Sequence, residues 1–226
     1  MDIYSFIIQN KEIFKFIYAA LIIAICVVIV FKTDRLFRLS SHNGIRYFRN
    51  AFFFFGLGFA SRYFLKFIFD VSGFEGFSVV PLLLFEFFVM MAGFFLLYSL
   101  IWRKFEAQGF SNKSSLFNIG IIIFYAFALV IAILDYLWGT LFFMFISQII
   151  TFLFASIISY RNSLKVKKPV QKLYFAAMLI SLFAWVLNTL LFSYFDFNIY
   201  VMVNIYILNM VFFLLFLYGV FRAMRN

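Results

Sequence analysis

Long apolar stretches alternate with short polar connections along the whole chain. Each stretch holds about 20 predominantly apolar residues, which is the length that an α-helix needs to cross the hydrocarbon core of a bilayer. The pattern predicts an all-α integral membrane protein, a single domain of seven transmembrane helices. The predicted spans are residues 13–31, 47–69, 78–102, 116–136, 140–160, 172–195 and 198–221.

Composition agrees with a lipid environment. Hydrophobic residues make up 66% of the chain and charged residues only 12%, so a soluble domain of 226 residues could not bury the apolar surface. The start of the chain, MDIYSF, lacks the basic segment of a cleaved signal peptide, and no A-x-A site follows the first apolar stretch. We therefore expect the first span to be a transmembrane helix of the protein.

Positive charge falls on alternate connections, which predicts the orientation of the helices. Fifteen of the nineteen Lys and Arg residues lie in segments 32–49, 102–113 and 161–172 or after the last span. Basic connections stay on the cytoplasmic side of a membrane. We expect the amino terminus outside, the carboxyl terminus in the cytoplasm, and a multi-pass protein of the cell membrane. The remaining connections carry the acids Asp70, Glu75, Asp135 and Asp196.

The net charge of +10 would favour nucleic-acid binding in a soluble protein, but here the topology accounts for the cations. The basic segments are attracted to anionic lipid, so the bilayer is the expected partner and nucleic acid is not. A second interpretation of segments 32–49 and 161–172 is a site for a cytoplasmic protein partner. The oligomeric state stays open.

Two of the predicted helices end in similar amino-acid sequences, which indicates an internal repeat. The third span ends FFLLYSLIWRK (94–104) and the seventh ends FFLLFLYGVFR (212–222). A second alignment, of the second span on the sixth, places Arg62 on Asn188. These matches predict a parallel repeat of helices 1–3 and 5–7, with helix 4 as the connector that restores the membrane orientation.

This 3+1+3 layout resembles the SWEET and PQ-loop transporters and, more loosely, rhodopsin-like seven-helix proteins. The resemblance concerns architecture only, because the chain has no PQ motif. Microbial rhodopsins hold retinal through a Lys in helix 7, and residues 198–221 contain none. We therefore expect no retinal and no other cofactor.

Polar side chains on five helices share one predicted depth. Counted from the ends of the helices, they lie roughly 9–12 Å below the outer surface. Ionisable residues in hydrocarbon are costly and usually face the bundle interior, so we expect either a ligand pocket or a buried polar network. The predicted site consists of Arg62, Glu86, Gln148, Asn188 and Asn204, with Tyr63, Lys66, Thr151, Trp185 and Asp135 at its periphery.

Three simpler interpretations compete with a pocket. Arg62 and Glu86 could form one intramembrane ion pair, while amide side chains hydrogen-bond between helices. Lys66 lies one turn nearer the surface and can extend its amine to water. Asp135 can simply mark the membrane interface beside Trp138.

The sequence carries no recognisable catalytic motif. It has one histidine (His42) and one cysteine (Cys26), which cannot assemble a typical zinc site. It lacks HExxH, G-x-S-x-G and phosphate-binding glycine loops, and Glu86 has no second deep carboxylate for paired acid–base chemistry. We expect neither a metal site nor enzyme activity.

Three functions remain, and the sequence favours the first over the other two. The first is a sensor or receptor-like protein that binds a small molecule from the outer side and meets a partner through its basic segments. The second is a 3+1+3 carrier that moves a small solute past the same residues, although the missing hinge prolines and the off-centre polar layer disfavour it. The third is a structural or assembly protein whose polar layer only stabilises the bundle.

Overall fold

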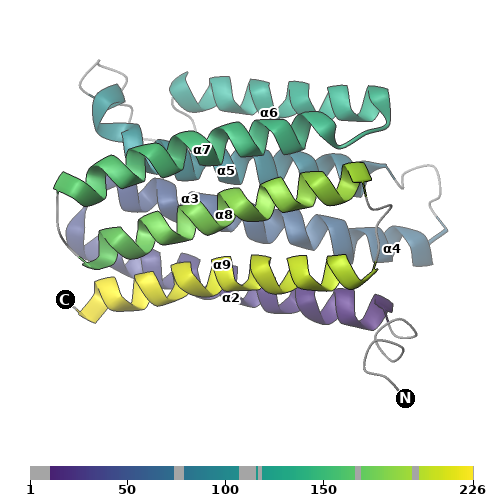
Figure 1. The fold of residues 1–226 in the computed structure, drawn as a ribbon, viewed down its shortest axis with the longest axis horizontal. Coiled ribbons are helices and arrows are strands. Elements are labelled where there is room, and N and C mark those ends of the chain that lie inside the picture. Colours follow the sequence, from purple (N-terminus) through teal and green to yellow (C-terminus); the bar gives the residue numbers. More distant parts are fainter. Residues whose placement is uncertain are drawn as a thin grey trace.

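The computed structural model describes residues 11–73, 79–106, 116, 119–165, 169–194 and 199–225, and all regular structure within them is helical (Figure 1). Seven helical segments are long and apolar enough to cross a membrane, which confirms the predicted number of helices. The elements are α2 (Lys11–Ser40), α3 (Asn43–Ala60), the π-helical turn η1 (Ser61–Leu65), α4 (Lys66–Val71), α5 (Val80–Glu106), α6 (Ile119–Trp138), α7 (Phe142–Lys165), α8 (Pro169–Tyr194) and α9 (Ile199–Arg225).

The helices at one end of the bundle run further than their apolar stretches. Most of segment 32–49, expected as a loop, is helical, and only Ser41 and His42 join α2 to α3. Ion pairs support these extensions, because Asp34 accepts hydrogen bonds from Arg38, at 3.0 Å, and from Arg49 on α3. We call this the basic end of the bundle; the other, where α4 and α6 terminate, is the opposite end.

Six helices form a closed ring, and α6 lies outside it (Figure 1). Around the ring each helix packs on the next in the order α2, α3, α5, α7, α8, α9, and α9 returns to α2. Helix α6 packs on α5 and α7. The ring thus consists of two sets of three consecutive helices, an order compatible with the 3+1+3 layout; the repeat itself stays a prediction.

Small residues bring α3 close to its two neighbours. A Cβ atom at Gly56 would lie 3.4 Å from Cβ of Cys26 on α2, and one at Gly58 would lie 3.1 Å from Val89 on α5. Close helix packing of this kind is typical of membrane bundles. Large apolar side chains are exposed on the outside of the bundle, so its surface suits a lipid bilayer.

Candidate functional site

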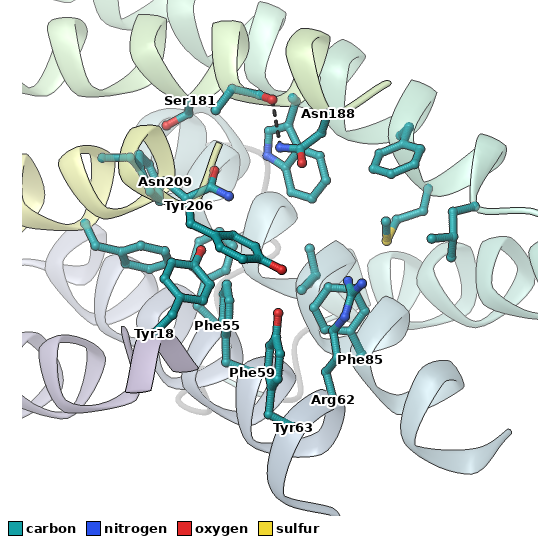
Figure 2. A pocket seen from close by; sticks show the side chains of 18 residues that line it. Tyr18, Phe55, Phe59, Arg62, Tyr63, Phe85, Ser181, Asn188, Tyr206 and Asn209 are labelled. Carbon is teal, nitrogen blue, oxygen red and sulfur yellow. Dashed lines mark hydrogen bonds between the residues drawn. The ribbon is translucent and has the colours of Figure 1, made fainter. Parts of the chain in front are cut away.

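A cavity of about 130 Å³ lies among all six helices of the ring, and we call it the Arg62 cavity. Figure 2 shows the guanidinium of Arg62 and the hydroxyl groups of Tyr63 and Tyr206 pointing toward the same space. Asn188 lines the cavity from α8. The cavity therefore combines one cation, phenol and amide groups, and many aromatic rings.

The π-helical turn explains why Arg62 enters the cavity and Lys66 does not. In a regular α-helix, Phe59, Arg62, Tyr63 and Lys66 follow one another at three- and four-residue spacing and share one face. The turn Ser61–Leu65 has π-helical hydrogen bonding, which inserts about one extra residue. The face rotates as a result: the first three residues line the cavity and Lys66 is exposed.

Arg62 is half-buried and makes no ion pair within 4.0 Å with any acid that the structure describes. Its guanidinium carbon lies 4.5 Å from the centre of the Phe85 ring and 5.9 Å from that of Tyr63. The face of an aromatic ring attracts a cation at such distances. The N–H groups at its edge remain able to bind another planar group.

Glu86 does not line the Arg62 cavity, although it follows Phe85, which does. It is 1% exposed, and its Oε2 atom has no hydrogen-bond partner among the described residues. Arg62 and Asp135 both act on it electrostatically, but Arg62 does so from beyond ion-pair distance. The direct Arg62–Glu86 ion pair considered from the sequence is therefore absent from the described part of the chain.

Gln148 and Thr151 do not line the Arg62 cavity, and Gln148 instead links two helices. The Gln148 side chain is fully buried, and its Nε2 atom donates to the carbonyl oxygen of Val89 at 2.9 Å, which links α7 to α5. A Cβ at Gly93 would lie 2.6 Å from Gln148 Oε1, so the amide occupies the space that this glycine leaves. The Thr151 hydroxyl donates to Ser147 within α7.

Asp135 caps the start of α7. Its carboxylate accepts hydrogen bonds from the backbone N–H groups of Phe143, at 2.9 Å, and Met144, at 2.8 Å. Gly139 makes the intervening turn with a φ of 62°, a conformation that favours glycine. Asp135 is 1% exposed, and it lies outside the set of residues that line the Arg62 cavity. A carboxylate at a helix N-terminus stabilises the helix, so this residue has a structural role.

Four of the ten predicted residues share the Arg62 cavity: Arg62, Tyr63, Trp185 and Asn188. The side chain of Asn204 lies outside the described residues. Sequence reasoning missed the polar residues that α2 and α9 contribute to the cavity, which are Tyr18, Tyr206 and Asn209. Tyr206, Asn209 and Phe213 recur at three- and four-residue spacing, a signal that places them on one face of α9.

A second cavity, of about 490 Å³, reaches toward the basic end, and we call it the Tyr174 cavity. Hydroxyl and amide groups line it, including those of Ser99, Ser159 and Asn162. The hydroxyls of Tyr174 and Ser99 are hydrogen-bonded at 3.1 Å, while the buried hydroxyl of Thr33 has no partner among the described residues. The volume falls within the range of about 300–1,000 Å³ typical of small-molecule sites.

Only one helical turn separates the two cavities on α8 and on α9. Phe212 lines the Arg62 cavity and Phe216 the Tyr174 cavity, with ring centres 4.9 Å apart. On α8, Ser181 lines the Arg62 cavity and Ala177, four residues earlier, lines the Tyr174 cavity. Four residues of α-helix span about 6 Å. We call the rings between the cavities the aromatic barrier; it consists of Phe52, Phe55, Phe212 and Phe216.

Comparisons with known proteins identify no relative: no family model, no curated protein and no solved structure matches the chain. The seven-helix architecture stands, and no particular family is shown. Within the described residues no three His, Cys, Asp or Glu side chains are grouped so that they could hold a metal ion.

Proposed function

We propose that the protein is a carrier that moves a small solute through the centre of its helix bundle. The observation that carries this proposal is the pair of cavities in opposite halves of the bundle, divided by a barrier about one helical turn thick on α8 and α9. With the orientation predicted from charge, the Arg62 cavity faces outward and the Tyr174 cavity faces the cytoplasm. Carriers work by opening a central site to one side at a time.

The depth of the barrier supports this function. Phe212 is the middle residue of the 27-residue helix α9, and Ser181 lies at the middle of the 26-residue helix α8. The floor of the Arg62 cavity therefore lies near the centre of the bundle, where carrier sites occur. The sequence had suggested an off-centre site because it located only the charged and amide residues.

The π-helical turn at Ser61–Leu65 supplies a local irregularity that the missing prolines do not. π-Helical turns within longer helices are frequent at functional sites. The Ser61 hydroxyl also donates to the carbonyl oxygen of Leu57 at 2.9 Å, a bond that often bends helices. The second helix of the ring thus has a place to flex next to the cavity.

Cysteine labelling from each side of the membrane tests the carrier. In a Cys26→Ala background, which removes the sole cysteine, Asn188→Cys and Ser159→Cys place thiols in the two cavities. A membrane-impermeant thiol reagent is added to sealed vesicles of either orientation. We expect Asn188→Cys to react from both sides, because the cavity opens to each side in turn, and Ser159→Cys likewise.

Leu187→Cys is the matched control, because Leu187 precedes Asn188 and is 44% exposed on the outside of the bundle. It should react from neither side in lipid. If each cavity reacts only from its own side, the carrier is refuted and the sensor, with one ligand pocket and no passage, becomes the better interpretation.

A further inference from the structure

The Arg62 cavity has an unbalanced positive charge. Arg62 is its one charged lining residue, and no Asp or Glu is among the described side chains that line it. A cation in an apolar site is costly unless an anion pairs with it. Asp135 cannot supply that pair because its carboxylate caps α7, and Glu86 is beyond ion-pair distance.

We propose that the substrate is a small monocarboxylate with a compact apolar or aromatic body, and this inference rests on the carrier function proposed above. The Cζ atom of the guanidinium lies over the rings of Phe85 and Tyr63, at 4.5 and 5.9 Å from their centres. A guanidinium can bind both oxygens of a planar carboxylate in two parallel hydrogen bonds. The carboxylate of the substrate thus supplies the anion that pairs with the Arg62 guanidinium.

The rest of the cavity defines the body of the substrate. Ten of the eighteen lining residues are aromatic, including Phe55, Phe145 and Trp185. A buried cavity of about 150 Å³ accepts a benzene ring, so the 130 Å³ here suits a single ring or a short branched chain. The hydroxyl of Tyr206 is placed to contact a polar edge of the same molecule (Figure 2).

The path beyond the barrier is compatible with an anion. The Tyr174 cavity is lined by hydroxyl and amide groups and by His42, and no Asp or Glu is among its described lining residues. The exit lies at the basic end, where Lys32, Arg35, Arg46 and Lys172 produce a positive potential. An acid-free path ending in positive charge favours anions over cations.

Binding of benzoate to the purified protein tests the substrate class. In equilibrium dialysis with labelled benzoate we expect saturable binding at one site. Benzamide has the same shape without the charge and should bind at least tenfold more weakly, and benzylammonium should not compete. Arg62→Gln should weaken benzoate binding at least tenfold and leave benzamide binding unchanged. Arg62→Lys should fall between, because it keeps the charge and loses the bidentate geometry.

Lys66→Gln is the matched control. It also removes one positive charge, but from an exposed side chain four residues after Arg62. This variant should bind benzoate like the wild type. Equal binding of benzamide and benzoate, tighter binding of benzylammonium, or unchanged benzoate binding by Arg62→Gln would each overturn the inference. Absence of all binding would overturn it too. The carrier function would then still be decided by the cysteine labelling, which needs no substrate.

Discussion

Replacement of Asp135 by alanine tests the most specific local structure in the bundle. The change deletes a carboxylate that accepts two backbone hydrogen bonds, at 2.9 and 2.8 Å, in a place that is 1% exposed to solvent. The N–H groups of Phe143 and Met144 would lose their acceptor, and water cannot easily replace it. The first turn of α7 would be left uncapped.

The expected loss follows from these two bonds. Hydrogen bonds to a charged group contribute about 1.5–3 kcal/mol each, whereas loss of a helix cap costs about 0.5–2 kcal/mol in total. We take about 3 kcal/mol for Asp135→Ala. For chains of this size 1 kcal/mol shifts the melting temperature by about 2–4 °C, so the shift should be about 6–12 °C. Asp135→Asn keeps one acceptor oxygen and should lose about half as much.

Thermal unfolding of the detergent-solubilised protein, followed by circular dichroism at 222 nm, measures this shift. Asp70→Ala is the matched control: Asp70 belongs to the same end of the bundle, but its side chain is exposed, and such changes usually cost less than about 0.5 kcal/mol. If both variants melt within about 2 °C of each other, the cap does not stabilise the protein and the reasoning fails.

Three further predictions concern the packing between helices. Gly93→Ala should lower the free energy of unfolding by about 1–3 kcal/mol, because its Cβ would lie 2.6 Å from Gln148 Oε1. Gly120→Ala is the control and should lose none, because the nearest atom to its Cβ would be 3.8 Å away. Equal losses in the two variants would contradict the clash. Gln148→Leu should cost about 1 kcal/mol by removing the hydrogen bond between α7 and α5; an unchanged melting temperature would argue against it. A double-mutant cycle of Arg62→Gln and Glu86→Gln should give a coupling below about 1 kcal/mol, and a value near the 3–5 kcal/mol of a broken buried pair would restore the direct ion pair.

The number of helices could be predicted from the sequence because a bilayer imposes one length on every span. Their ends could not, because charged side chains near a membrane surface do not stop a helix. Residues Lys32 to Ser40 read as a polar connection, yet they continue α2. Hydrogen bonds to Asp34 from Arg38 and Arg49 then stabilise the extended helices at the basic end.

A count along the sequence predicts a depth for each residue, but it does not predict the rotation of that residue about its helix axis. A count of residues from the helix ends brought Arg62, Glu86 and Gln148 to one level. Only Arg62 of these three lines the cavity, because the side on which a residue falls depends on the neighbouring helices. The Tyr174 cavity was missed for another reason: apart from His42, its polar side chains are hydroxyls and amides, which do not stand out in a search for charge.

The turn Ser61–Leu65 also gives the chain a tolerance that a uniform helix lacks. A π-helical turn holds about one residue more than an α-helical turn. A helix can therefore accommodate the insertion of a single residue by forming such a turn. Deleting one residue there would return the turn to regular α-helix and leave the helix beyond it, including the exposed Lys66, in its present orientation. A one-codon deletion of Phe64 or Leu65 is therefore absorbed within the turn, and Arg62 stays the one charged residue among those that line the cavity.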